Sequence, residues 1–419
     1  MRFRSHITGA LLLFGSGVLL FGQQQPLKIE ELVSEALKSN PEILTAQKRY
    51  EAARQRPTQE SSLPDPMLSL GYTSAGSPRP FAGIGVEPSA NAGLMISQEV
   101  PFPGKRKLRG DMARKEAGAE FEQYQGTQLN VVSRLKQAYY RLYYAYAASD
   151  VLERNKELLR KLLRITEARY SVGRAAQQDV FKTQTQLSIL EARLVNLTRE
   201  RGAREAEINS LLNRAPERPL ARPAEIEPKD TIILLDDLYA AARENSPMLR
   251  RDQKMIERTE LALNLARKDY YPDYVLSGGY FNQGSMPDMY QFRIDIKLPT
   301  YFWRKQRAAV TEQAQSLSQS RRTYESTNQA LHFRIKDDFL MATTSNRLMK
   351  LYGQTVIPQA SLALESSLAT YETGTIDFLS VLTNYVTVVE YEMNYYEELQ
   401  NYYLALSRLE EMTGLPVIK

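Results

Sequence analysis

Residues 290–299 read Tyr-Gln-Phe-Arg-Ile-Asp-Ile-Lys-Leu-Pro, and this stretch decides the fold. Apolar and charged side chains alternate along it with a period of two, which places them on opposite faces of an extended strand. In a soluble sheet such a strand is half buried, whereas in a transmembrane barrel it has lipid on one side and water on the other. The apolar residues are Phe292, Ile294, Ile296 and Leu298, and the charged residues are Arg293, Asp295 and Lys297.

A second alternating strand lies in the first half of the chain, where Leu94, Ile96 and Val100 are the apolar residues. Pro101 follows this strand as Pro299 follows the other. Further matching segments occur in the same order in both halves, and their spacing is too long for a solenoid unit, so they indicate a duplicated half-structure. The pairs are Asn40-Pro41 with Ser246-Pro247, Tyr170-Ser171-Val172-Gly173 with Tyr371-Glu372-Thr373-Gly374, and Asp179-Val180-Phe181 with Asp377-Phe378-Leu379.

Each half predicts the same elements: a helix, an antiparallel hairpin of two short strands, and two long helices. Residues 105–170 contain no proline, and from residue 131 their apolar positions follow the 3.5-residue period of coiled-coil packing. Pro358 predicts a kink in the corresponding helix of the second half. The first helices are predicted at 29–56 and 234–269, and the hairpins pair 67–72 with 93–100 and 274–281 with 290–298.

Residues 1–22 have the pattern of a secretory signal peptide, with Arg2 and Arg4 before an apolar stretch at 7–21. The alternative is an N-terminal anchor helix, but the apolar stretch is short for one. The two halves meet in a proline-bearing connector at about 215–230, since proline at this density prevents a continuous helix. The predicted divisions are therefore a signal peptide at 1–22, a first repeat at 23–230 and a second repeat at 231–419.

The composition of the 419 residues argues against an enzyme, a metalloprotein and a nucleic-acid-binding protein. There is no cysteine and only two histidines, so thiolate chemistry is excluded and little is available for metal ligation or base catalysis. Met286 and Met289 have neither type near them, so we predict no metal site and no cofactor. The net charge is +5, with basic and acidic residues interspersed as on solvated helix faces.

Four strands per chain cannot close a barrel, because the smallest closed barrels need about eight. An open sheet edge is not tolerated in hydrocarbon. Long polar helices with a heptad pattern likewise cannot bury their apolar seams alone. If the strands lie in a membrane, several copies of the chain must therefore share one barrel.

At this point the chain resembles the TolC-like outer-membrane factors, the exit ducts of tripartite efflux and secretion systems. The resemblance rests on the duplication, on the two Tyr-x-x-Gly segments each followed by Asp, and on the junction Gln98-Glu99-Val100-Pro101-Phe102-Pro103-Gly104-Lys105-Arg106. It covers nearly all of residues 27–416. The junction is more similar to the heavy-metal branch than to the multidrug branch.

The resemblance implies an α+β membrane protein: a homotrimer whose 12-stranded β-barrel, four strands per chain, lies in the outer membrane and continues as a long α-helical barrel across the periplasm. Its partners would be a periplasmic adaptor (a membrane fusion protein), an inner-membrane pump of the RND type and the lipid of the outer membrane. Arg293, Asp295 and Lys297 would face the barrel lumen. The adaptor would dock at two helical tips, Val172-Gly173-Arg174 and Thr373-Gly374-Thr375.

Several residues keep two interpretations. Asp179 and Asp377 line the pore or stabilise the starts of the return helices through the helix macrodipole. Ser380 and Thr383 occupy positions where some relatives carry an acidic gate, so such a gate is not expected here. The tyrosines at 139–146 line a conduit or pack between helices. The basic cluster at 105–109 contacts lipid phosphate or is a solvated helix start.

The leading functional prediction is a passive outer-membrane exit duct. One rival is a periplasmic coiled-coil adaptor or scaffold, which would not need lipid-facing strands. Another is an enzyme with long helical arms, which the near absence of His and Cys disfavours. A third is the outer-membrane component of a type I protein secretion system, which the sequence does not distinguish from an efflux duct.

Overall fold

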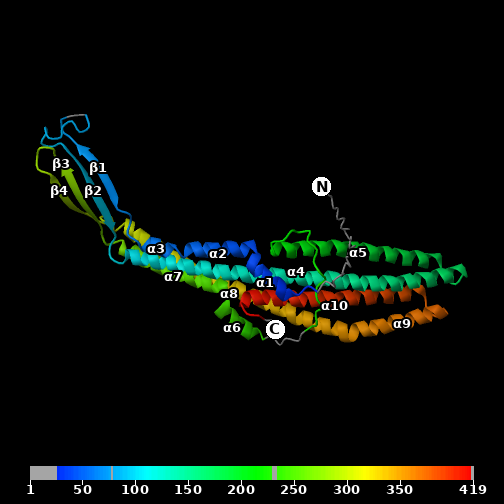
Figure 1. Cartoon of the computed structure of the whole chain (residues 1–419). Coiled ribbons are helices and arrows are strands. Elements are labelled where there is room, and N and C mark those ends of the chain that lie inside the picture. The colour runs from blue at the N-terminus through cyan, green and yellow to red at the C-terminus, as the bar shows by residue number, and fades with distance from the viewer. Residues whose placement is uncertain (1–25, 77–78, 229–233, 417–419) are drawn as a thin grey trace, which may run out of the picture.

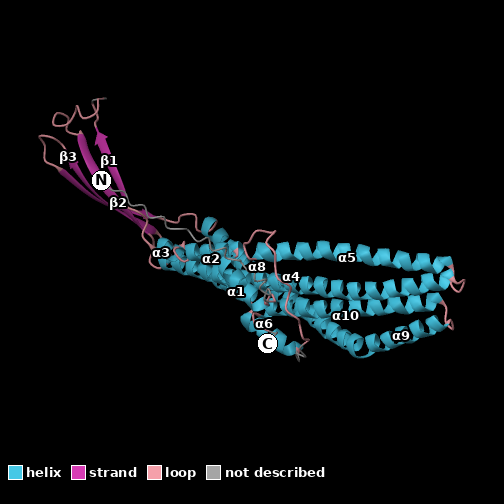
Figure 2. Ribbon diagram, turned by 45° about the vertical axis from the view of Figure 1, so that its right-hand side comes forward, coloured by secondary structure: helices cyan, strands magenta, loops and turns pink. Residues whose placement is uncertain are grey.

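The computed structural model describes residues 26–76, 79–228 and 234–416, and the predicted signal peptide at 1–22 lies outside these residues. The molecule is elongated, with a β-sheet at one end and a layer of long helices reaching to the other (Figure 1). In a view turned by 45° the sheet and the helices again occupy opposite ends (Figure 2). Sheet and helices are therefore separate parts of one long body.

The sheet has four antiparallel strands in the order β1-β2-β3-β4. The hairpins β1–β2 and β3–β4 are those predicted from sequence, and the β2–β3 pairing joins the two halves of the chain. The predicted duplication thus gives one continuous sheet rather than two. The strands are β1 Met67–Thr73, β2 Asn91–Val100, β3 Asp273–Asn282 and β4 Met289–Lys297.

The register aligns an apolar series from all four strands on one face. Leu70 pairs with Leu94, Leu94 with Tyr280, and Tyr280 with Tyr290. Directly opposed residues lie on the same face of a sheet. In the single chain this face is open: Leu70 is 77% exposed and Phe292 is 75% exposed. A soluble protein rarely presents such a continuous apolar surface to water.

The opposite face of the sheet carries the charged residues, together with a few apolar ones such as Val275 and Phe281. Lys297 Nζ lies 2.7 Å from Glu99 Oε1 on β2, and Arg293 Nε lies 3.0 Å from Asp295 Oδ2 within β4. These pairs are about half exposed, so each contributes about 1 kcal/mol or less. Their importance is geometric, because they show that the charged residues of the alternating stretch share one side.

The prediction of one continuous helix at 29–56 is wrong. The structure has three helices there: α1 Ile29–Ser39, α2 Pro41–Ala53 and α3 Arg56–Ser61. The residue before a proline is driven out of the helical region, and Asn40 is extended at φ −66° and ψ 125°. Its side chain then caps α2 by accepting hydrogen bonds from two backbone N–H groups.

The predicted helix at 234–269 is divided for the same reason, into α6 Leu235–Asn245 and α7 Pro247–Lys268. Ser246 precedes Pro247 and is extended at φ −63° and ψ 116°. The matching Asn40-Pro41 and Ser246-Pro247 pairs are therefore matching helix breaks.

The long helices agree with the prediction. α4 Lys105–Ser171 is unbroken over 67 residues, and α5 Gln177–Leu211 returns beside it. In the second half, α8 Lys305–Leu351 passes through a π-helical turn at Tyr352–Val356 into α9 Ile357–Thr373. This irregular turn lies just before Pro358, where the kink was predicted. The return helix is α10 Phe378–Thr413.

The helices form a single layer with α4 as its common member. Near the sheet, α4 packs between α2 and α7, and α7 packs on α8. Farther from the sheet the order is α5, α4, α10, α9 in both views (Figures 1 and 2). No helix in the described part of the chain combines the length and apolar composition needed to cross a bilayer.

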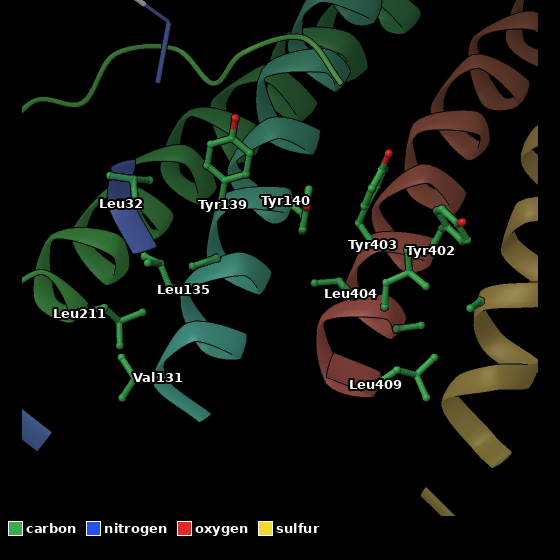
Figure 3. Packing of buried hydrophobic residues seen from close by; sticks show 14 of the residues in the cluster. Leu32, Val131, Leu135, Tyr139, Tyr140, Leu211, Tyr402, Tyr403, Leu404 and Leu409 are labelled. Atoms are coloured by element: carbon green, nitrogen blue, oxygen red, sulfur yellow. The ribbon is translucent and has the colours of Figure 1, made fainter. Parts of the chain in front are cut away.

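The largest hydrophobic core lies midway along the layer, where α1, α4, α5 and α10 meet (Figure 3). Leu135 and Leu142 of α4 are fully buried there. Tyr140 stacks on Tyr403 with ring centroids 4.6 Å apart, and the Tyr139 hydroxyl donates to the carbonyl oxygen of Leu27 at 2.9 Å. Burial raises the pKa of Tyr139 to about 12. Tyr139 and Tyr140 therefore pack between helices, as one of the two interpretations predicted.

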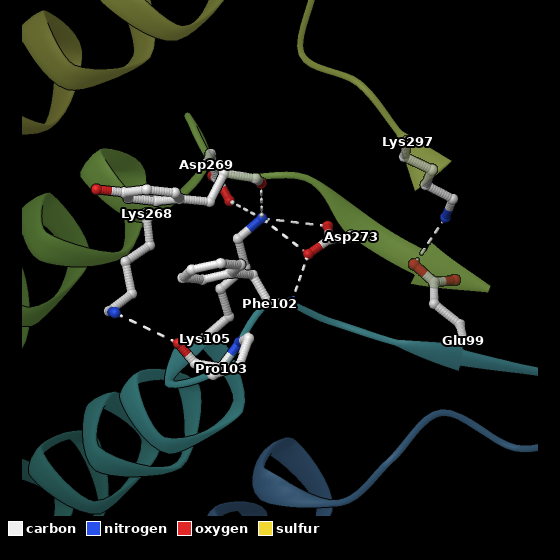
Figure 4. A network of polar contacts seen from close by, with 9 residues as sticks. Glu99, Phe102, Pro103, Lys105, Lys268, Asp269, Asp273 and Lys297 are labelled. Atoms are coloured by element: carbon white, nitrogen blue, oxygen red, sulfur yellow. Dashed lines mark hydrogen bonds and ion pairs between the residues drawn. The ribbon is translucent and has the colours of Figure 1, made fainter. Parts of the chain in front are cut away.

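At the junction between sheet and helices, Lys105 is buried against two carboxylates (Figure 4). Its Nζ lies 3.0 Å from Asp273 Oδ1 and 3.2 Å from Asp269 Oδ1. Asp273 also accepts the backbone N–H of Phe102 at 2.7 Å. Both sequence-based interpretations, lipid contact and a solvated helix start, are therefore wrong for Lys105. Its ammonium group instead forms ion pairs inside the protein that join α4 to β3.

We expect Lys105→Met to destabilise the junction by about 2 kcal/mol, because it leaves two carboxylates close together without their cation. The partial exposure of both carboxylates keeps the cost below that of a fully buried pair. Heat-induced loss of strand signal in circular dichroism measures the effect. The matched control is Lys107→Met, which removes an exposed lysine of the same helix turn. Equal melting temperatures for the two variants would contradict this account.

Candidate functional site: the two helical tips

The first tip is the turn between α4 and α5, at the end of the molecule far from the sheet (Figure 1). Gly173 has φ +71°, in the left-handed region that favours glycine. The N–H of Arg174 donates to the carbonyl oxygen of Arg169 at 2.8 Å, which ends the helix in a hydrogen-bonded turn. Val172 is 66% exposed just before this glycine. The tip therefore presents a rigid turn with an apolar side chain in solvent.

The second tip, between α9 and α10, has the same construction. Gly374 has φ +88°, and the N–H groups of Gly374 and Thr375 both donate to the carbonyl oxygen of Thr370 at 3.1 Å. Thr373 Oγ1 donates to the same oxygen at 2.9 Å. The structure thus places the predicted tip residues Val172, Gly173, Arg174, Thr373, Gly374 and Thr375 in two exposed turns of similar geometry.

Arg169, in the last turn of α4, joins the two tips. Its guanidinium lies over the ring of Tyr371 in α9, 4.5 Å from the ring centroid. Nη1 donates to the carbonyl oxygen of Tyr371, and Nη2 donates to that of Arg174 at 3.3 Å. A Cβ atom added at Gly374 would lie 3.4 Å from Nη2. One side chain therefore holds the ends of both helical hairpins.

The sequence alone does not single out Arg169 as a residue of the tips. The available signal was its position four residues before Gly173, because a basic residue in the last turn of a helix often binds the free carbonyl groups there. That signal identifies a capping residue of α4 but not its partner Tyr371, which lies in the other half of the chain. Tyr371 is 3% exposed.

We expect Arg169→Gln to loosen both tips, since it removes the contact with the Tyr371 ring and shortens the reach to two carbonyl groups. A loss of about 1.4 kcal/mol corresponds to about tenfold faster amide hydrogen exchange by local opening at 169–175 and 370–375. Arg164→Gln is the control, because Arg164 is exposed on the same helix one turn earlier. Unchanged exchange at the second tip in Arg169→Gln would show that the two tips are independent.

The four pore or gate candidates lie in the first turns after the tips. Asp377 precedes α10, and its Oδ1 accepts the Ser380 hydroxyl at 2.5 Å, which lowers the pKa of this exposed carboxyl. Thr383 Oγ1 donates to the carbonyl oxygen of Leu379 at 2.8 Å. Asp179 lies in the first turn of α5. The Asp377–Ser380 contact fits stabilisation of a helix start.

Across the described residues, no group of three or more His, Asp or Glu side chains has a geometry that could hold a metal ion. Met286 follows Ser285, whose Oγ donates to the carbonyl oxygen of Gly85 at 3.0 Å, so the loop of the second hairpin contacts the loop of the first. The polar groups at both ends of the molecule thus serve turns, caps and ion pairs.

The family model described as outer membrane efflux protein matches the chain twice, at residues 32–214 and 238–415. The chain is 22% identical over 417 residues to "Outer membrane protein TolC" of Vibrio cholerae, covering 92% of this chain and 90% of that protein.

Solved structures show the same fold. VceC of Vibrio cholerae is 18% identical with a TM-score of 0.80, covering 93% of this chain and 97% of that one. CusC is 16% identical, also with a TM-score of 0.80, covering 93% and 92%. MtrE of Neisseria gonorrhoeae is 18% identical with a TM-score of 0.76, covering 93% and 89%. The chain therefore belongs to the outer membrane efflux protein family: it is an outer-membrane efflux channel with a TolC-like fold and not an enzyme.

Proposed function

We propose that three copies of this chain form the exit duct of a tripartite efflux system. The observation that carries this proposal is the register of the sheet, which aligns the apolar series of β4 with apolar residues of the other three strands on one face and leaves β1 and β4 each with a single described partner strand. In a membrane, the backbone N–H and C=O groups of these edge strands find hydrogen-bond partners only if β4 of one copy pairs with β1 of the next. Three copies give a closed 12-stranded barrel.

The helical layer supports the same closure. Its edge helices α5 and α9 carry exposed apolar residues far from the sheet: Val195 is 71% exposed and Leu362 is 65% exposed. Pairing of these edges between copies would bury both residues and close a helical barrel around the same axis. The single-chain exposure of these side chains is thus explained by neighbouring copies.

We propose that Arg293, Asp295 and Lys297 line the water-filled lumen of the barrel. Support comes from their shared face and from the Lys297–Glu99 pair, which keeps charged groups on the side opposite the apolar surface. The apolar face then contacts the lipid of the outer membrane.

The two tips form the periplasmic entrance in this proposal, and they dock the helical hairpin of a periplasmic adaptor that links the duct to an inner-membrane pump of the RND type. Asp179, Asp377, Ser380 and Thr383, one to two turns beyond the tips, then lie close to the entrance. Support comes from their distance from the sheet and from the exposed turns at Gly173 and Gly374. The repeats at 23–230 and 231–419 each supply one tip.

The likeness of the Pro-Gly-Lys-Arg junction to the heavy-metal branch stays a prediction, and two of its residues have structural roles. Gly104 has φ +90° and Lys105 is buried in an ion-pair network. CusC is one structural neighbour among several of similar TM-score. The proposal is therefore an efflux duct whose pump selects the substrate.

The test is complementation in a strain that lacks its own exit duct, together with the mass of the purified assembly in detergent. We expect restored resistance to small toxic compounds and a mass of three chains. A stable monomer that retains its full strand content would contradict the shared barrel. Restored protein secretion without resistance would favour a type I secretion component instead.

A further inference from the structure

The only tryptophan of the chain, Trp303, lies in an exposed aromatic segment between β4 and α8. Tyr301, Phe302 and Trp303 are 67%, 50% and 56% exposed. Their rings contact one another edge to face, with centroids 5.1 Å apart for Phe302–Trp303 and 6.3 Å apart for Tyr301–Trp303. Three large aromatic side chains thus form one cluster that the single chain leaves open to solvent.

The cluster continues the lipid-facing surface of the sheet. It follows Leu298, which ends the apolar series of β4 and is 66% exposed. It also lies where the sheet gives way to the helices, so it is at the boundary between the membrane and the periplasm (Figure 2). Tyrosine and tryptophan concentrate at such boundaries, because their rings are apolar and their tips are polar.

Basic residues adjoin the aromatic cluster. Arg304, Lys305 and Arg307 are exposed at the start of α8, and none of their side chains has an ion-pair or hydrogen-bond partner within the described ranges. Backbone hydrogen bonds join the aromatic and the basic residues: the N–H groups of Arg304 and Lys305 donate to the carbonyl oxygen of Tyr301, and that of Arg307 donates to the carbonyl oxygen of Phe302. The aromatic and the basic residues therefore belong to one hydrogen-bonded turn.

The corresponding junction of the first repeat is closed. Phe102 stacks on Tyr271, with centroids 4.5 Å apart and planes 13° apart, and Lys105 is buried (Figure 4). The duplication therefore gives two strand-to-helix junctions, one buried and one exposed. One uses its aromatic ring and its cation inside the protein, and the other presents both to the surroundings.

We propose that residues 301–307 anchor the channel to the periplasmic leaflet of the membrane by binding phospholipid headgroups. The three rings occupy the glycerol and carbonyl region, and the three cations contact headgroup phosphates. Phospholipid is favoured as the occupant because the site combines an apolar surface continuous with the lipid-facing strands and an uncompensated positive charge. A neighbouring copy of the chain would need acidic groups opposite these cations.

The single tryptophan makes the anchor directly measurable. The full chain is reconstituted in vesicles of phosphatidylcholine and phosphatidylglycerol, and Trp303 fluorescence is quenched with lipids brominated at different depths. Trp303→Phe supplies the background. We expect the strongest quenching from bromines just below the carbonyl region. Quenching by aqueous acrylamide alone, or by neither quencher because a second copy covers the ring, would overturn the proposal.

The role of the three basic residues in binding anionic lipid is tested by placing the bromines on only one of the two lipids. With equal parts of both lipids, brominated phosphatidylglycerol should quench Trp303 about twofold more than brominated phosphatidylcholine, because the basic residues enrich anionic lipid around the ring. Replacing Arg304, Lys305 and Arg307 by Gln should abolish this difference. The matched control replaces Arg106, Lys107 and Arg109 at the first junction by Gln and should keep it.

Equal quenching by both lipids in the unchanged protein would overturn the headgroup contact. The inference depends on the strands lying in the membrane, so the mass of the assembly is measured in the same preparation. A trimer without lipid quenching of Trp303 contradicts the anchor alone, whereas a monomer contradicts the proposed function.

Discussion

Ile294→Arg should prevent the chain from assembling in the outer membrane, whereas its neighbour Arg293→Ile should still assemble. Ile294 lies on the apolar face, paired with Leu276, and an arginine on the lipid side of a barrel near the midplane costs about 2–4 kcal/mol. A trimer carries the substitution three times. Arg293 lies on the polar face, and Arg293→Ile exposes an isoleucine to the water of the lumen, which costs little.

The amount of trimer in outer-membrane fractions, resolved without heating, measures this difference. The two variants are matched, because they exchange the same residue types at adjacent positions of one strand. Equal trimer yields would contradict the assignment of faces. A reversed order would mean that the charged face contacts lipid.

Replacements at the tips should abolish export while leaving the trimer intact. Val172→Glu puts a charge at an exposed apolar position without straining the backbone, and Thr373→Trp adds bulk at the second tip. Gly173→Asn tests the turn itself, since asparagine tolerates the left-handed region better than other side chains. A Cβ at Gly173 meets nothing within 4 Å, so a loss there comes from strain in the turn at φ +71° or from a missing partner contact and not from a clash within the chain.

Resistance in a strain without its own duct measures export, and trimer yield is followed in parallel. Lys107→Met is the control within the same hairpin, because Lys107 is an exposed residue of α4 far from both tips. Replacing Met286 and Met289 together should likewise leave export unchanged. Normal export from the tip variants would remove the docking proposal, and loss of export from the double methionine variant would point to a metal-specific duct.

The strands and the long helices could be predicted because their patterns are local. Alternation over Tyr290–Lys297 fixes both the strand and its faces, and the absence of proline through residues 105–170 allows one long helix. The breaks at Asn40 and Ser246 were also local signals, since each precedes a proline. They were missed because the helical pattern continues on both sides of each break.

Contacts between the halves could not be predicted in the same way. Lys105 has the appearance of a solvated helix start until Asp273 is brought against it by the β2–β3 pairing. Arg169 has the sequence features of a simple helix cap, and its contact with Tyr371 becomes visible only when the tips of the two helical hairpins meet. Both depend on how the duplicated halves meet, which no residue pattern within one half specifies.

The two edge strands of the sheet have a consequence for how the channel is made. A sheet with the unpaired edges of β1 and β4 cannot enter hydrocarbon alone, because its backbone groups would lose water and gain no partner. Insertion therefore cannot precede association, and it cannot run faster than the copies associate. Channel biogenesis should then rise more steeply than linearly with the concentration of newly exported chains, and chains that wait would need protection of their edges in the periplasm.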